Sequence, residues 1–358
     1  MFSHNNYVTF DGINTTENIK AIAKKPGGSK PGFITLVDGQ LYLVKIESGG
    51  YRNKIIGSDE EAGIVESLTA QLIRKIWGDI FAADIRLITL TGISNLNSLV
   101  IPLSIDEASK YCEGYNLESF DLNQINAITI ECSKANYATI APYEVKSANF
   151  EQSLRANNKE VIINDKIMNQ LTALQTIAKL LDIHDYKFEN MLSDNAMSHL
   201  KLIDCAAAFH TSKNFDNVDQ LNLSSLELRE LFSCRNHGEV DLNNCFSSLQ
   251  SEVKFNFNHN IVKWVISTFL KFSNENLIEF LNNYKKILSD NTLYNIKTSL
   301  DCIKMKLLKQ INQIKQAQNG TKLSEASFIN NRPTATKEEN STHKQSESSK
   351  LILNPNQI

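Results

Sequence analysis

The order of strand-forming and helix-forming segments constrains this chain most, because it divides the 358 residues into two parts of different character. The first hundred residues favour strands around a single helix. From about residue 106 onward, the apolar residues recur mainly with helical spacing. Runs of strands followed by runs of helices are typical of an α+β protein. We therefore expect a small, mostly antiparallel sheet with one helix, joined to a larger helical part.

The strand-rich part begins with a hairpin signal. Two strand-like runs, FITLV and QLYLVKIE, flank Asp38-Gly39, a dipeptide that favours a tight turn between strands. A helix follows, with Ser58 as its N-cap and Gly78 as its natural stop. Two further strands are predicted at 84–92 and 97–105.

The remainder is predicted to be mostly helical. A strongly amphipathic helix covers 169–183, and a short strand candidate covers 199–205. After about residue 318 the chain is polar, and we expect disorder because little apolar surface offsets the entropy of ordering. Later helices are predicted at 224–232, 259–272, 275–288 and 293–316. The predicted units are an N-terminal lobe (1–105), a helical lobe (106–250), a helical extension (251–318) and a tail (319–358).

Composition excludes several classes of protein. The net charge of −3 provides no basic field for nucleic acid. The six cysteines form no CxxC pair and have no histidine at zinc-ligand spacing, so we expect reduced thiols. We expect no transmembrane segment, because no apolar run is long enough. The N-terminus lacks the pattern of a cleaved signal peptide.

The stretch that most suggests chemistry is Asp185-Tyr186-Lys187-Phe188-Glu189-Asn190, which follows the amphipathic helix. Asp204 stands fourteen residues after Asn190 (204 − 190), at the end of an apolar run. An Asn amide oxygen and an Asp carboxylate are hard oxygen ligands for Mg²⁺ or Mn²⁺. A DxKxxN string also arises by chance in polar turns, and the run into Asp204 suits a buried junction between strand and helix. The mutual spacing and the residues upstream favour the chemical interpretation.

This pattern resembles the catalytic loop of protein kinases, in which Asp, Lys and Asn share the same spacing. The resemblance implies ATP as phosphoryl donor, with Asn190 and Asp204 holding Mg²⁺ or Mn²⁺. It implies that Asp185 orients or deprotonates the acceptor hydroxyl and that Lys187 contacts the transferring phosphate. The sequence departs from the family where Ile183 and His184 replace the usual His and Arg. It departs again where Asp204-Cys205-Ala206 replaces D-F-G, and no A-P-E sequence follows.

An upstream lysine and a glutamate extend the resemblance. Lys45 ends the run LYLVK, which resembles the V-A-I-K strand of kinases. Glu66 lies among apolar residues of the next helix, where a carboxylate requires a partner, and Lys45 is the candidate. Glu60 and Glu61 compete for this role, but the helix dipole explains acids in a first turn. We expect Glu66 to hold Lys45 against the α- and β-phosphates of ATP.

The loop containing Gly28, Ser29 and Lys30 precedes the hairpin, where a phosphate-covering loop belongs. With the strand that ends at Lys45, it also resembles the N-terminal lobe of HipA-type kinases. The resemblance covers about residues 23–210 and implies a bilobal kinase-like fold. It places Ile101 and Leu103 in the hinge that binds adenine through its backbone, with Pro102 between them removing one donor.

The C-terminal region suggests a setting. Its helices carry lysines that either face solvent or form a basic surface for a phosphoinositide or an inositol phosphate. The polar tail is similar to the C-terminal secretion signals of bacterial type IV effectors. The chain therefore resembles effector kinases of intracellular bacteria such as Legionella, which implies secretion into a host cytosol or onto a membrane surface. The lysines in question are Lys285, Lys286, Lys304, Lys306 and Lys309.

Taken together, these features predict a kinase that transfers the γ-phosphate of ATP to a Ser or Thr hydroxyl of a host protein. One alternative is a lipid or inositol phosphate kinase. The second is a catalytically inactive kinase-like module that binds phosphoinositides.

Overall fold

The structure of the protein is a computed structural model, which describes twelve stretches of the chain. The longest of them contain the helices α1, α5 and α8 to α10. The described residues are 21–25, 31–37, 40–46, 61–89, 137–143, 147–150, 153, 165–183, 190–194, 198–205, 208–209 and 258–329.

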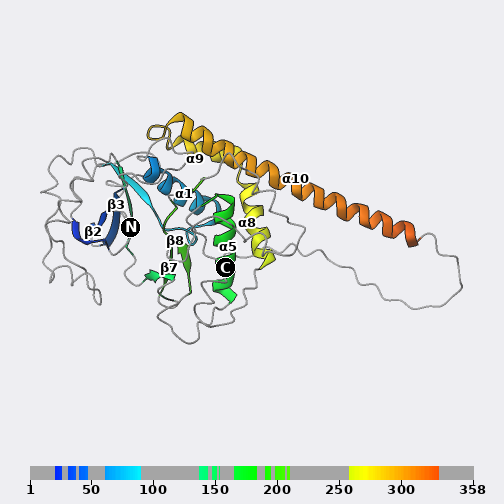
Figure 1. Ribbon diagram of the computed structural model, residues 1–358, viewed down its shortest axis with the longest axis horizontal. Coiled ribbons are helices and arrows are strands. Elements are labelled where there is room, and N and C mark those ends of the chain that lie inside the picture. The colour runs from blue at the N-terminus through cyan, green and yellow to red at the C-terminus, as the bar shows by residue number, and fades with distance from the viewer. Residues whose placement is uncertain are drawn as a thin grey trace.

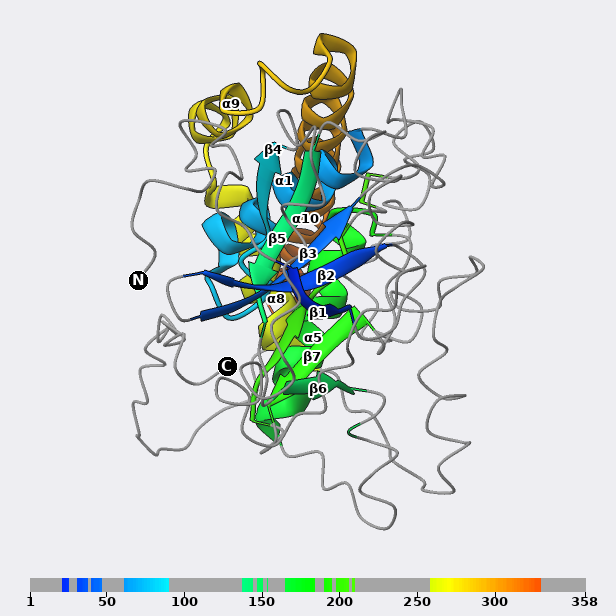
Figure 2. The same ribbon diagram turned by 90° about the vertical axis from the view of Figure 1, so that its left-hand side faces the viewer.

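A five-stranded antiparallel sheet forms the first layer, with strand order β1-β2-β3-β5-β4 (Figure 2). The predicted hairpin is confirmed, because Val37 lies opposite Gln40 where β2 passes into β3. From Tyr42 to Ile46, β3 alternates between buried and partly buried residues, so one face of the strand is buried more deeply than the other. The strands are β1 (Ala21–Lys24), β2 (Gly32–Val37), β3 (Gln40–Ile46), β4 (Arg86–Thr89) and β5 (Tyr137–Pro142).

β5 differs from the expectation drawn from the sequence. We predicted helices after residue 105, yet β5 lies between β3 and β4 in the first sheet. The strand-like run at 97–105 lies outside the described residues. A short strand such as YATIAP gains its stability from the neighbours that it pairs with, so its own sequence indicates it only weakly.

The helix α1 (Glu61–Trp77) packs against β4 and β5. Its apolar residues recur every three or four positions and are buried, apart from the half-buried Ile76. The helix ends at the predicted stop, since Gly78 has a φ of 112° and its N–H bonds to the Arg74 carbonyl. The proposed N-cap at Ser58 lies outside the described residues.

A second sheet of three antiparallel strands has the order β6-β7-β8. Its strands are β6 (Ser147–Asn149), β7 (Met191–Asp194) and β8 (Leu200–Leu202). β8 confirms the core of the strand predicted at 199–205, whereas β6 and β7 were not predicted. The helix α5 (Asp165–Leu180) begins four residues before the predicted start (169 − 165) and packs on β8 and α8.

Three helices complete the described fold: α8 (His259–Lys271), α9 (Asn274–Asn282) and α10 (Asp290–Ile329). Asn258 and Ser273 cap the first two, each accepting a backbone N–H two or three residues later. Figure 1 shows α10 continuing well beyond the body of the protein. No helix in the described part of the chain is both long and apolar enough to cross a membrane.

The length of α10 corrects the predicted start of the disordered tail. We expected the helix to end at residue 316 and disorder to begin at 319, but α10 continues to Ile329. The prediction considered only how little apolar surface this segment can bury. A helix that has already formed can extend through a polar segment, because each added residue gains one backbone hydrogen bond. Residues 330–358 lie outside the described part.

One continuous apolar core joins α1, α5, β8 and the three C-terminal helices. Trp77 stacks on Phe269 with ring centroids 6.0 Å apart, and Phe81 contacts Trp264. The α+β class with a small antiparallel sheet and a larger helical part is therefore confirmed. Because α1 packs against the first sheet and also belongs to the shared core, the two parts are packed together.

Gly32 provides a test of how tightly the first sheet is packed. A Cβ added at this position would lie 2.3 Å from the Val44 carbonyl oxygen on the neighbouring strand. We predict that Gly32→Ala lowers the free energy of unfolding by about 1–3 kcal/mol, because backbone must move to admit the methyl group. Urea denaturation measures the change. Gln40→Ala, at the exposed start of β3, is the control, and an equal loss in both variants would contradict the explanation.

Candidate functional site

Lys45 lies near the end of β3, inside the five-stranded sheet. Gly32 of β2 and Thr139 of β5 are its neighbours on the two adjacent strands. Only 14% of its side chain is exposed. The strand therefore carries a cation to a position that is largely shielded from water, where it requires an anionic partner.

Glu66 of α1 is that partner, as the sequence predicts. The Lys45 Nζ donates to Glu66 Oε1 over 2.6 Å, and the Glu66 side chain has no exposed surface. Removing two charges from water is costly, and close pairing offsets this cost only when both partners are present. The contact therefore fixes α1 against β3 at one defined position.

Asp204 is a second carboxylate close to Lys45. Its Oδ2 is 3.8 Å from the Lys45 Nζ, and 36% of its side chain is exposed. Asp204 follows β8, two residues after the end of this strand. Lys45 is thus close to two carboxylates, one buried and one partly exposed to solvent.

Asn190 lies at the same end of the second sheet as Asp204. It directly precedes β7 and is buried, and its carbonyl oxygen accepts the Ile203 N–H at 3.0 Å. In the β7–β8 pair, Met191 lies opposite Leu202. Asn190, just before β7, and Asp204, just after β8, therefore lie at the same end of two adjacent strands. The pairing thus brings together the two residues predicted to hold a metal.

The stretch that contains Asp185 and Lys187 lies outside the described residues, but both of its ends are described. At one end, Asp182 adopts a φ of 49° and closes α5, and the Leu181 carbonyl accepts the Phe209 N–H at 2.8 Å. At the other end, Asn190 bonds to Ile203. The backbone before Asp204 is therefore hydrogen-bonded to the end of this stretch at Asn190, and the backbone after it is hydrogen-bonded to the end at Leu181.

The segment between α1 and β4 connects Glu66 to Asp204. Ala82 pairs with Leu202 of β8 as a parallel bridge, and the Ala83 N–H donates to the Leu202 carbonyl at 2.8 Å. The Leu202 N–H in turn donates to the Phe81 carbonyl at 3.0 Å. The strand that leads to Asp204 is thereby held by the residues that follow α1.

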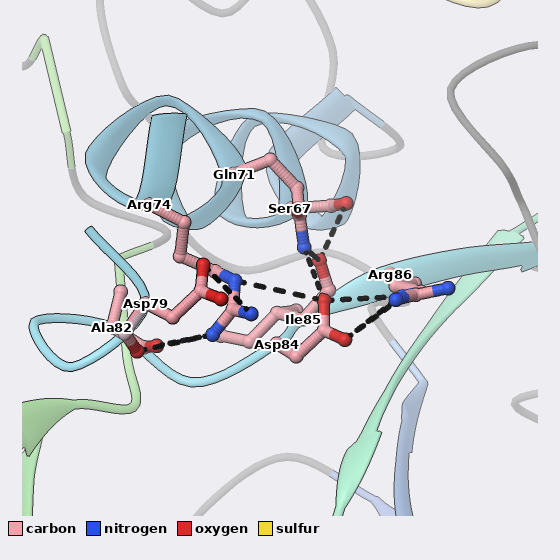
Figure 3. A network of polar contacts seen from close by, with 8 residues as sticks. All are labelled: Ser67, Gln71, Arg74, Asp79, Ala82, Asp84, Ile85 and Arg86. Atoms are coloured by element: carbon pink, nitrogen blue, oxygen red, sulfur yellow. Dashed lines mark hydrogen bonds and ion pairs between the residues drawn. The ribbon is translucent and has the colours of Figure 1, made fainter. Parts of the chain in front are cut away.

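Polar side chains of α1 hold the same segment from the other side (Figure 3). Gln71 donates to Asp84 Oδ1 and to the Ile85 carbonyl, each over 2.8 Å. Arg74 donates to the carbonyls of Asp79 and Ala82. The sequence alone does not reveal this network, because its members are ordinary polar residues whose contacts form only in the folded chain.

Arg86 completes the network by pairing with Asp84, with Nη2 and Oδ2 2.7 Å apart. Burial would raise the pKa of Asp84, but hydrogen bonds from Arg86 and Gln71 and the charges of Arg86 and Arg74 outweigh it. The pKa of Asp84 is therefore lower than its ordinary value. The carboxylate is ionised at neutral pH and keeps its partners in place.

Cys205, next to Asp204, is fully buried. Burial raises the pKa of its thiol well above the ordinary value, and the charges of Glu66 and Asp204 add to this effect. The thiol is consequently protonated at neutral pH. A protonated buried thiol is a poor nucleophile, so the site does not suit cysteine-based catalysis.

The donor atoms suit a hard divalent cation that is only partly coordinated by protein. Asp204 offers a solvent-facing carboxylate and Asn190 an amide oxygen from the adjacent strand. Among the described residues, no group of three or more His, Cys, Asp and Glu side chains could enclose a metal. Mg²⁺ is commonly held by one or two carboxylates together with phosphate oxygens and water. Asn190 and Asp204 therefore fit such an ion when it arrives with a phosphate ligand.

The remaining predicted site residues lie outside the described part of the chain. These are Gly28, Ser29 and Lys30 of the expected phosphate loop, and Ile101 and Leu103 of the expected hinge. Along the chain, β5 ends at Pro142 and β6 begins at Ser147. The Tyr143 N–H donates to the Leu41 carbonyl at 2.9 Å, so this connection starts beside β3.

Comparison with known proteins yields little. No model of a known protein family and no curated protein sequence matches this chain. Among solved structures, the chain is similar to a Helicobacter pylori proinflammatory kinase, CtkA, with a TM-score of 0.43 and 12% identity. The match covers 82% of this chain and 93% of that chain. A likeness this distant assigns neither an activity nor a substrate to the protein.

The buried ion pair provides a prediction about stability. We expect Lys45→Met to lower the free energy of unfolding by about 3–5 kcal/mol, because it leaves the Glu66 carboxylate buried without this cation. Adding Glu66→Gln should recover part of the loss, since the neutral amide is less costly to bury. Chemical denaturation of both variants measures this. A double variant less stable than Lys45→Met would contradict the explanation.

Asp84 provides a prediction about pH. Its lowered pKa contributes stability above the unfolded-state value of about 3.9, and this contribution disappears as the pH falls through the lower folded-state value. At pH 7, Asp84→Asn should cost about 1–3 kcal/mol, because it removes hydrogen bonds to a charged group. The difference from wild type should shrink below about pH 4. Asp79→Asn, at an exposed acid of the same network, should change little at any pH.

Proposed function

We propose that the protein is an ATP-dependent phosphotransferase of the kinase type. The observation that carries this proposal is the position of the Lys45 ammonium, 2.6 Å from Glu66 and 3.8 Å from the solvent-facing Asp204. In kinases, a strand lysine held by a helix glutamate contacts the phosphates of ATP, and an aspartate beyond it holds the metal. The same three types of residue come here from a strand, a helix and the segment after a second sheet.

A purely structural ion pair accounts less well for this arrangement. A buried pair stabilises a fold poorly compared with apolar residues of the same volume, so stability alone gives little reason to retain it. A structural pair also has no need of Asp204, which is partly exposed and lies on the second sheet. The hydrogen bonds that tie Leu202 and Ile203 to their neighbours hold Asp204 close to Lys45.

The proposal gives each predicted site residue a role. ATP bound with Mg²⁺ or Mn²⁺ would supply the transferable phosphoryl group and neutralise its charge. Lys45 would bind the phosphates and Glu66 would orient Lys45. Asn190 and Asp204 would hold the metal. Asp185 would position the acceptor hydroxyl and accept its proton, and Lys187 would contact the transferring phosphate.

The adenine site is expected on the connection after β5. In kinases the backbone of the segment between the lobes binds adenine, and residues 143–146 join the two sheets here. The segment starts beside β3, the strand that carries Lys45. We therefore favour residues 143–146 over Ile101 and Leu103 for this contact.

Ser or Thr hydroxyls of proteins are the acceptor that we favour, with host-cell proteins first because of the composition of the tail. A lipid or inositol phosphate acceptor is the alternative. The basic surface that would attract such anions is smaller than the sequence indicates. Lys304 is buried and donates to the Phe272 carbonyl and to Asn274 Oδ1, where it caps the end of α8.

Transfer of labelled γ-phosphate from ATP tests the proposal, with Mg²⁺ and Mn²⁺ in separate reactions. Host-cell extract, phosphoinositide vesicles and soluble inositol phosphates serve as acceptors side by side. We predict that wild type transfers label and that Asp204→Asn and Asp185→Asn each reduce the rate by about 100-fold or more. These isosteric changes remove a charge without leaving a cavity.

The matched control is Asp165→Asn, which removes an exposed carboxylate at the start of α5 and should leave transfer unchanged. The acceptor that takes up label separates protein, lipid and inositol phosphorylation. If wild type neither transfers label nor binds ATP in a metal-dependent manner, the proposed activity is wrong.

A further inference from the structure

The turn between α9 and α10, residues 283–289, contacts the start of α1, the helix that carries Glu66. Glu61, the first residue of α1, is buried, and its Oε1 accepts the Ser289 N–H at 2.8 Å. Its Oε2 accepts the Thr292 hydroxyl, also at 2.8 Å. A carboxylate that the sequence analysis explained by the dipole of its own helix thus bonds to a different helix.

This contact replaces a missing part of the α10 cap. Ser289 precedes α10, and its hydroxyl accepts the Thr292 N–H, as an N-cap residue does. In a capping box, a glutamate three residues later accepts the N–H of the N-cap residue. Here Thr292 occupies that later position, and Glu61 of α1 accepts the Ser289 N–H instead. The start of α10 and the start of α1 therefore depend on each other.

A second contact from the same turn lies one residue after Glu66. The buried Tyr284 side chain lies close to Ser67, whose hydroxyl donates to the Ile85 carbonyl at 3.0 Å. Because successive residues of a helix are about 100° apart, Glu66 is rotated by about 140° from Glu61 and about 100° from Ser67. The α9–α10 turn thus holds α1 on sides other than the one that Glu66 presents to Lys45.

We infer that Glu61 is a positioning residue for the Lys45–Glu66 pair, and that the C-terminal helices hold α1 where this pair forms. The inference rests on the proposed function insofar as it concerns ATP. Its structural part, that Glu61 holds α1 in place, stands independently. The protein therefore carries within its own chain the contacts that set the position of its glutamate helix.

The test compares Glu61→Ala, Glu61→Gln and Asp290→Asn in the full-length chain. Amide hydrogen exchange reports on α1, and titration with ATP and Mg²⁺ reports on the nucleotide site. We expect Glu61→Ala to speed exchange in α1 and to raise the Kd for ATP by about tenfold, the equivalent of one hydrogen bond to a charged group. Glu61→Gln keeps an oxygen for Ser289 and should retain most of the affinity. Asp290→Asn removes an exposed charge at the same end of α10 and should change neither.

A double-variant cycle separates positioning from general loss of stability. In a Glu66→Gln background, Glu61→Ala should change the ATP affinity by less than about twofold, because the pair that it positions is already disrupted. A full tenfold loss in that background would overturn the inference, as would unchanged exchange of α1 in Glu61→Ala. If wild type does not bind ATP while Glu61→Ala still speeds exchange in α1, the proposed function fails and the structural role of Glu61 stands.

Discussion

The carboxylate of Glu66, with none of its side chain exposed, is the constraint on which the rest of the structure depends. A charge at such a position requires a cation at contact distance, and Lys45 reaches it only if β3 and α1 keep a fixed separation. β3 is held by β2 and β5 on either side. The helix α1 is held at its start by the α9–α10 turn, and at its end by Trp77, whose indole N–H donates to the Val265 carbonyl.

The parts of this arrangement that depend on residues close together in the sequence could be predicted. The hairpin followed from Asp38-Gly39 between two strand-forming runs, and the end of α1 from Gly78. The Lys45–Glu66 pair followed from a charged residue among apolar ones, which requires a partner. Asn190 and Asp204 were expected to act together because their spacing resembles a kinase pattern. The short β7–β8 hairpin explains why they lie close, and their role as metal ligands stays a prediction.

The parts that depend on distant residues could not be predicted. β5 pairs with strands that lie about fifty residues or more before it, and its own six residues indicate a strand only weakly. The role of Glu61 was hidden because a first-turn acid already has a local explanation. Lys304 looked like one exposed lysine among several, yet it caps α8 with its ammonium near the ring of Phe269. In each case the deciding partner is known only once the chain is folded.

The span of the contacts on α1 also determines when the site can form during synthesis. Glu61 and Thr292 are 231 residues apart in the chain, and Trp77 and Val265 are 188 apart. A ribosome adds about 5–20 residues per second, so α1 precedes its last partner by on the order of 10–50 s. The nascent chain carries Lys45 and Glu66 throughout this interval without the helices that hold them together. The last third of the polypeptide therefore supplies contacts that hold α1 in the first third, and a translation product interrupted before Val265 lacks them.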